Sequence, residues 1–153
     1  MRNLLFFILL LWSGLAAAQA PATDEVPNFC GVDIVLPAGC VVDSRYELHS
    51  DKYRLQWMYL NYPQLKPTAE EVVRHQKKQH KKTEVEPLDG FILDQPVKGH
   101  LLSYATDAGM GYELIFYGVA KGQPVLVQLT MEMNPERTAD LPEPARQIIR
   151  LTR

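Results

Sequence analysis

Residues 53–60 carry the clearest hydrophobic pattern of the chain, an alternation with a period of two. Such a pattern is typical of a strand whose two faces meet different surroundings. One face would carry Tyr53, Leu55, Trp57 and Tyr59, and the other Arg54, Gln56, Met58 and Leu60. Asn61-Tyr62-Pro63 supplies turn residues, so we expect the strand to end there.

Further strand-like runs follow in the second half of the chain, separated by glycine-containing turns. These runs are Phe91–Leu93, His100–Thr106, Tyr112–Ala120 and Val125–Met133. Residues 112–120 are apolar on both faces, as expected of a central strand. Asp107–Gly111 and Lys121-Gly122 are short connections, so the last three runs predict an antiparallel meander.

Two segments have the pattern of helices. Residues 69–81 follow Thr68, which can cap the helix, and Glu71 lies at the position that completes a capping box. A second helix is expected over residues 143–151. The sequence therefore predicts one α+β domain, in which an antiparallel sheet is packed by two helices.

The N-terminus has the layout of a secretory signal peptide. Arg2 precedes a short apolar run at Leu4–Trp12, and small residues follow it. We expect cleavage after Ala18, although Ala18-Gln19-Ala20 offers a second site that ends at Ala20. Residues 1–18 would then be removed, residues 19–29 would form a flexible leader, and residues 30–153 would form the domain. No second long apolar run follows, so the mature chain is not predicted to span a membrane.

Charge and localisation narrow the classes of function. The formal net charge is −2, and it becomes −3 when Arg2 leaves with the signal peptide. This balance argues against nucleic-acid binding, which needs many bases that face phosphates. We expect the mature protein to act in the bacterial periplasm or outside the cell.

Cys30 and Cys40 are the two cysteines of the chain, and an oxidising compartment favours a disulfide between them. The spacing differs from the C-x-x-C of redox enzymes. An extended course of residues 31–36 would instead hold the two cysteines roughly 20 Å apart. Either the segment curls into a closed loop or the thiols stay unpaired.

Four features follow one another along the chain: Leu36-Pro37-Ala38-Gly39, the helix at Thr68–Lys81, the glycines 109 and 111 before Tyr112, and the final helix at Pro142–Leu151. This layout resembles the PsbP-like and DcrB-like folds. The resemblance implies an α+β sandwich and a non-catalytic role in binding or assembly. The Cys30 and Cys40 pair departs from the pattern of these folds.

Candidate catalytic and metal-binding groups do not form a recognisable set. His75 and His80 are five residues apart, so on a helix their rings would point about 140° apart. No G-x-S-x-G motif surrounds Ser44, Ser50 or Ser103. The sequence predicts no metal site, no cofactor and no catalytic residues.

Two features could contact a protein partner. Tyr59 and Tyr62 flank the predicted turn at Pro63, and exposed tyrosines are good anchors at interfaces. Lys77 and Lys78 belong to a basic stretch at residues 74–82, which could touch an acidic partner or form a solvated helix end.

These observations favour a non-catalytic protein-binding module, such as an inhibitor or immunity protein against a toxin or hydrolase that acts in the cell envelope. An accessory factor for envelope assembly or transport is an alternative. An enzyme with an unrecognised site is another. The sequence does not specify the partner or the oligomeric state.

Overall fold

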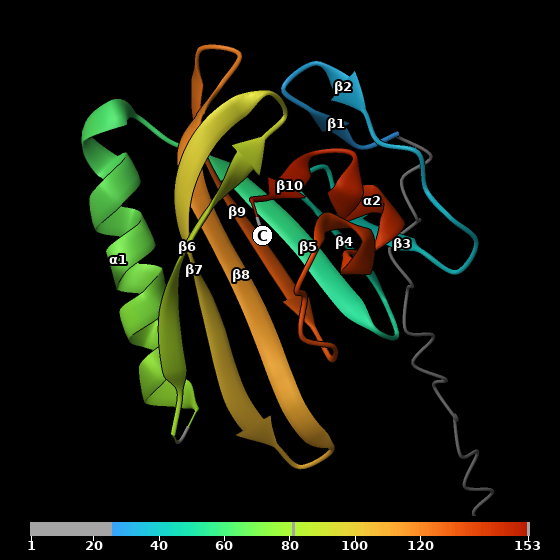
Figure 1. Cartoon of the computed structure of the whole chain (residues 1–153). Coiled ribbons are helices and arrows are strands. Elements are labelled where there is room, and N and C mark those ends of the chain that lie inside the picture. The colour runs from blue at the N-terminus through green and yellow to red at the C-terminus, as the bar shows by residue number, and fades with distance from the viewer. Residues whose placement is uncertain (1–25, 81, 153) are drawn as a thin grey trace, which may run out of the picture.

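The computed structural model describes residues 26–80 and 82–152, and the predicted signal peptide lies outside this part of the chain. Eight strands form one curled antiparallel sheet in the order β10-β6-β7-β8-β9-β5-β4-β3 (Figure 1). They are β3 (Val41–Ser44), β4 (Glu47–Ser50), β5 (Tyr53–Tyr59), β6 (Glu84–Ile92), β7 (Gln95–Thr106), β8 (Gly109–Ala120), β9 (Gln123–Met131) and β10 (Ile149–Leu151). The prediction of an antiparallel sheet built around a meander is confirmed.

The sheet separates two hydrophobic clusters of unequal size. The larger one lies on the face that carries Leu55, Trp57 and Phe116. A hairpin of β1 (Asn28–Phe29) and β2 (Val32–Asp33) and a one-turn helix, α2 (Glu143–Arg146), cover this face (Figure 1). The side chain of Phe29 is fully buried there, so the packed part of the domain extends beyond the predicted boundary at residue 30.

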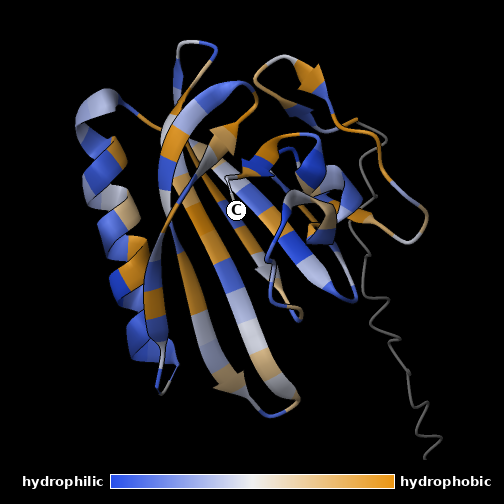
Figure 2. Cartoon of the chain, viewed as in Figure 1, coloured by the Kyte–Doolittle hydropathy of each residue, from blue (hydrophilic) through white to orange (hydrophobic). Residues whose placement is uncertain are grey.

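The opposite face, here called the helix face, carries α1 (Tyr62–Gln79), the one long helix of the described residues. Ala69 packs there with four buried side chains of the sheet: Leu102, Tyr104, Ile115 and Leu126. Most of the remaining surface of α1 is hydrophilic, and a few hydrophobic positions turn toward the sheet (Figure 2). The helix therefore rests on the sheet along a narrow stripe.

Helix α1 begins seven residues earlier than the sequence predicted. Pro63 lies in the first turn, where a missing N–H is tolerated, and Pro67 lies inside the helix. Thr68 is consequently an interior residue, and Asn61 holds the cap position without a side-chain hydrogen bond. The predicted capping box of Thr68 and Glu71 is wrong, because burial of Ala69 and packing of Val72 on the sheet outweigh the helix-breaking tendency of Pro67.

The predicted C-terminal helix at residues 143–151 is largely wrong. Helix α2 is a single turn, and the chain then enters β10, which pairs with β6 through Ile149 and Ile92. Ile149 and Leu151 are buried on either side of exposed Arg150, which is the period of a strand. The guanidinium of Arg150 lies 4.3 Å from the centroid of the Phe91 ring.

Strand β6 is longer than the predicted run at Phe91–Leu93, and it includes Pro87. Strand β10 pairs only with residues 90–92 of β6, so Pro87 has no partner strand on that side. A proline needs a position where no ladder hydrogen bond is lost, and the open edge of β6 provides one.

Candidate functional site

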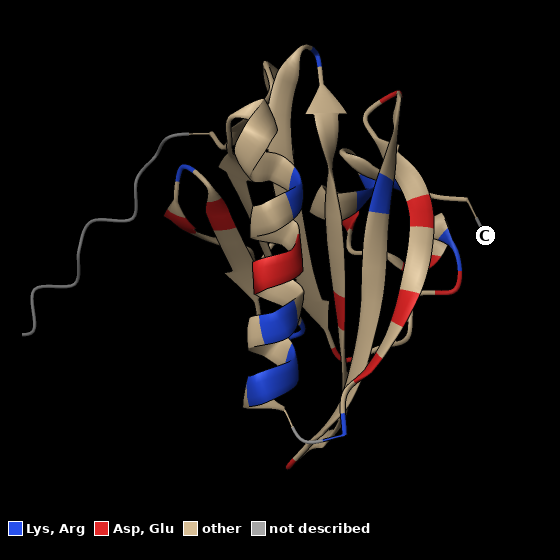
Figure 3. Ribbon diagram, turned by 90° about the vertical axis from the view of Figure 1, so that its left-hand side faces the viewer, with Lys and Arg blue, Asp and Glu red and all other residues tan. Residues whose placement is uncertain are grey.

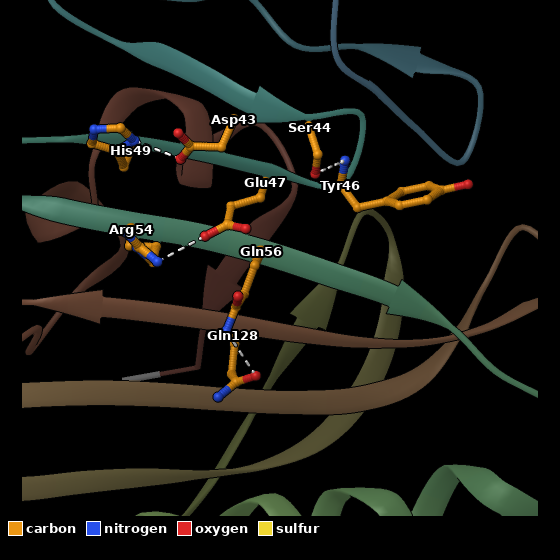
Figure 4. A network of polar contacts seen from close by, with 8 residues as sticks. All are labelled: Asp43, Ser44, Tyr46, Glu47, His49, Arg54, Gln56 and Gln128. Carbon is orange, nitrogen blue, oxygen red and sulfur yellow. Dashed lines mark hydrogen bonds and ion pairs between the residues drawn. The ribbon is translucent and has the colours of Figure 1, made fainter. Parts of the chain in front are cut away.

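A row of paired polar side chains crosses the helix face beside α1, here called the polar row (Figure 4). It begins at the sheet edge, where Nδ1 of His49 lies 2.6 Å from Oδ2 of Asp43. Arg54 follows, with Nη1 2.9 Å from Oε1 of Glu47. The row arises because β3, β4 and β5 pair in a register that brings these positions to one face.

The polar row continues into the sheet through two glutamines. Nε2 of Gln56 on β5 donates to Oε1 of Gln128 on β9 at 3.1 Å. Nε2 of Gln128 then donates to Oε1 of Glu113 on β8 at 2.6 Å. A chain of hydrogen bonds therefore leads from the half-buried Gln56 to a carboxyl group that is 1% exposed.

Burial raises the pKa of Glu113, because an ionised carboxyl in a dry site loses its hydration, and the hydrogen bond from Gln128 opposes that shift. Among the ion pairs of the described residues, none involves Glu113. A buried carboxyl of this kind is a typical sign of a functional or regulatory position.

Two hollows adjoin Gln128. One, of about 370 Å³, lies along α1 between Thr68 and Lys78. The other, of about 160 Å³, is lined by Tyr46, Gln56 and Met58. Both are open to solvent and lie on the part of the sheet that α1 leaves uncovered.

The turn between β3 and β4 places an exposed tyrosine at one end of the molecule. Tyr46 is 42% exposed, and its ring makes edge-on contacts with the rings of Trp57 at 6.4 Å and Tyr59 at 5.9 Å. The guanidinium of Arg45 lies 5.9 Å from the same ring. In Figure 4 this ring projects away from the polar row.

We call this surface the aromatic end, defined by Arg45, Tyr46, Met58 and Tyr59. A hollow of about 230 Å³ beside Tyr46 is lined by Arg45 and Tyr59 from this set. Tyr46 and Met58 also line the smaller hollow next to Gln128, so the aromatic end adjoins the polar row. Tyr62 is 64% exposed at the first position of α1.

Of the two predicted aromatic anchors, one is mainly structural. The Tyr59 hydroxyl accepts a hydrogen bond from the backbone N–H of Cys30 at 2.9 Å, and its ring packs near Phe29. Burial raises the pKa of Tyr59. Tyr59 therefore ties the β1–β2 hairpin to β5 and presents only part of its ring to solvent.

The predicted basic contact at Lys77 and Lys78 lies at the opposite end of α1 from Tyr62. Both lysines are exposed in the last turn of the helix, where Lys and Arg gather (Figure 3). Fifteen residues of helix correspond to about 23 Å. The structure does not bring the two sets of predicted contact residues together.

Cys30 and Cys40 are free thiols in the structure, in contrast to the predicted disulfide. Cys30 lies beside Tyr59 and Cys40 beside Tyr53, at opposite ends of β5. The length of this strand separates the two cysteines. Burial raises the pKa of Cys30, which makes its thiol less reactive.

Sequence reasoning missed Tyr46, Gln128 and Glu113. Glu113 could have been noticed, because it is a lone charge in the apolar run at residues 112–120. Gln56 and Gln128 are 72 residues apart in the chain. Their hydrogen bond depends on the pairing of β5 with β9, which the sequence alone does not show.

No group of metal-binding side chains occurs among the described residues, and no described helix is long and apolar enough to cross a membrane. Comparison with known proteins found no protein-family model that matches the chain and no match among curated proteins.

Proposed function

We propose that this chain is an exported, non-catalytic protein-binding module whose partner docks on the aromatic end. The observation that carries the proposal is the exposure of Tyr46 beside Arg45, together with the two hollows that Tyr46 lines. Tyrosine and arginine dominate the energetic centres of protein interfaces, because they bury large areas and still satisfy their polar atoms.

The neighbouring polar row suits the rim of such an interface. Its polar groups are already paired, Asp43 with His49 and Glu47 with Arg54, and their side chains are partly exposed. A partner would meet paired charges around an aromatic anchor, as is common in protein interfaces. An inhibitor or immunity protein against an envelope-active toxin or hydrolase is the class of function that we favour.

The proposal can be tested by affinity capture from a bacterial periplasmic extract, using the tagged mature chain and mild crosslinking. One stoichiometric protein partner is expected, and Tyr46→Ala should reduce its capture at least tenfold. Met110→Ala is the matched control, because Met110 is 48% exposed at the start of β8, away from the aromatic end. Equal loss in both variants would contradict docking at Tyr46.

The basic end of α1 provides a second control. A partner seated on the aromatic end does not need to reach Lys77 and Lys78, so charge reversal of both should leave capture unchanged. Loss of capture in this variant alone would move the interface to the helix end.

The activity of the captured partner separates the two forms of the proposal. Stoichiometric loss of that activity on adding the mature chain would identify an inhibitor or immunity protein. Retained activity in a stable complex would favour the alternative of an assembly or transport factor.

A further inference from the structure

Helix α1 is held to the domain by few buried side chains. Of its eighteen residues, Ala69 is the one that is fully buried. It belongs to the small cluster on the helix face, whereas the large core lies on the other face and contains no residue of α1. Elements with few buried contacts open at lower free energy than the rest of a protein.

Glu113 lies on the face that α1 covers. It is paired across the sheet with Leu102 on β7 and Thr130 on β9. Among the described residues, α1 is the single helix packed on this face, so α1 and neighbouring side chains exclude water from Glu113. The hollow along α1 reaches Gln128, the hydrogen-bond partner of Glu113.

We propose that α1 is a cover whose opening is controlled by ionisation of Glu113. The protonated carboxyl is tolerated in the closed state, where Gln128 is its hydrogen-bond partner. The ionised carboxyl has no cationic partner there and gains hydration when α1 lifts. Protons therefore favour the closed state, and a rise in pH favours the open state.

Opening would expose an apolar surface in the middle of the sheet. Leu102, Ile115 and Leu126 are fully buried under α1 in the closed state. The cover would make that surface available only at higher pH.

Other titratable groups lie near the same boundary. Burial of the Tyr104 ring on β7 raises its pKa, and the nearby Glu113 raises it further, so the phenol stays neutral at physiological pH. The ring of His80 stacks on Tyr104 at 3.7 Å, and Glu71, His75 and Lys78 line the hollow along α1.

Two further charged or titratable groups belong to the polar row. Arg54 and His49 lie on β5 and β4, and each is paired with a carboxylate. A substitution at Glu113 leaves all of these groups in place, so it isolates the contribution of this one carboxyl.

Hydrogen exchange of the full mature chain, read by mass spectrometry between pH 4.5 and 8 and corrected for intrinsic rates, tests the proposal. Protection of α1 should fall by up to tenfold per pH unit and then level off, while β8 and β9 stay protected. In Glu113→Gln the protection of α1 should not change with pH. Glu132→Gln, an exposed carboxylate at the end of β9, should behave like the wild type.

Two results would overturn the proposal. In one, α1 and the central strands lose protection together, which means global unfolding. In the other, Glu113→Gln keeps the pH dependence of the wild type.

A measurement on the wild type alone covers the case in which Glu113→Gln does not fold. The titration of the Glu113 carboxyl, followed by carbon NMR, should end at the pH where protection of α1 levels off. A midpoint above that pH, or in the range of an exposed glutamate, would also overturn the proposal.

Discussion

The ring of Phe116 on β8 lies directly over the α-carbon of Gly99 on β7, its cross-strand partner. A Cβ atom at position 99 would lie 2.5 Å from Cδ1 of Phe116 and 2.6 Å from the carbonyl oxygen of Ile115. A Cβ at Gly90 on β6 would lie 2.8 Å from Cζ of the same ring. One aromatic side chain thus fills the space left by glycines on two neighbouring strands.

We therefore expect Gly99→Ala to destabilise the domain by about 1–3 kcal/mol, the range for overpacking a tight core. The double variant Gly99→Ala/Phe116→Leu should lose less stability than the sum of the single variants, because the smaller side chain makes room for the new methyl group. Urea unfolding of the four proteins measures this coupling. Additive losses would show that the ring and the methyl group do not collide.

Glu113 should also influence the global stability of the domain. Its pKa is raised in the folded state, so the folded chain holds the proton more tightly than the unfolded chain does. The unfolding free energy should therefore fall as the pH rises from the ordinary value of a glutamate, about 4.3, through the folded-state value.

Glu113→Gln removes this contribution and keeps a hydrogen-bonding group beside Gln128. The variant should be more stable than the wild type at pH 8, and the difference should shrink toward pH 4. Urea unfolding at several pH values measures it, with Glu132→Gln as the exposed control. A variant that is less stable than the wild type at pH 8 would contradict the expected sign.

The sequence predicted those elements in which hydrophobic period and turn residues agree. Strand β5 alternates cleanly, and the glycine turn at residues 121–122 marks the hairpin of β8 and β9. The sequence predicted the start of helix α1 seven residues too late, because proline is common in the first turn of a helix. In the structure Pro67 lies inside the helix, because the residues around it pack on the sheet. Residues 149–151 form a strand of three residues, which is too short for its alternation of buried and exposed side chains to be recognised in the sequence. The pairing with β6 defines this strand.

The candidate site was less accessible to sequence reasoning than the fold. Tyr62 was correctly expected to be exposed, but Tyr46 was missed, because its neighbours come from β5 and not from its own segment. The polar row is likewise assembled from five strands, and its partners follow from sheet register and not from spacing along the chain.

Lys121 offers a test of turn chemistry. It lies in the two-residue turn between β8 and β9 with φ of 48°, a left-handed conformation that is unfavourable for lysine and better tolerated by asparagine. Lys121→Asn should stabilise the domain by about 0.5–1 kcal/mol. Lys52→Asn, also in a tight turn but without a positive φ, is the control and should not stabilise the domain. Thermal unfolding compares the two, and equal effects would contradict the explanation from backbone conformation.

The two cysteines provide the last prediction. Their thiols lie against tyrosines at opposite ends of β5, so a disulfide between them requires residues 30–40 to leave the positions seen here. Ile34 is buried within this segment, and the backbone of Val35 is held by two hydrogen bonds to the Gln147 side chain, at 2.9 and 2.8 Å. Forming the bond would break these contacts.

A thiol count on the purified, denatured and unreduced mature chain should therefore return two, and reducing agent should leave the melting temperature unchanged. The matched variant Cys40→Ser should leave one thiol and lower the stability by no more than about 1 kcal/mol, because the serine hydroxyl can take the place of the thiol beside Tyr53. A count of zero in the monomeric wild type, with a lower melting temperature after reduction, would show that the bond does form. In that case its stabilisation, about 3 kcal/mol for a loop of this length, exceeds that of the contacts made by Ile34 and Val35.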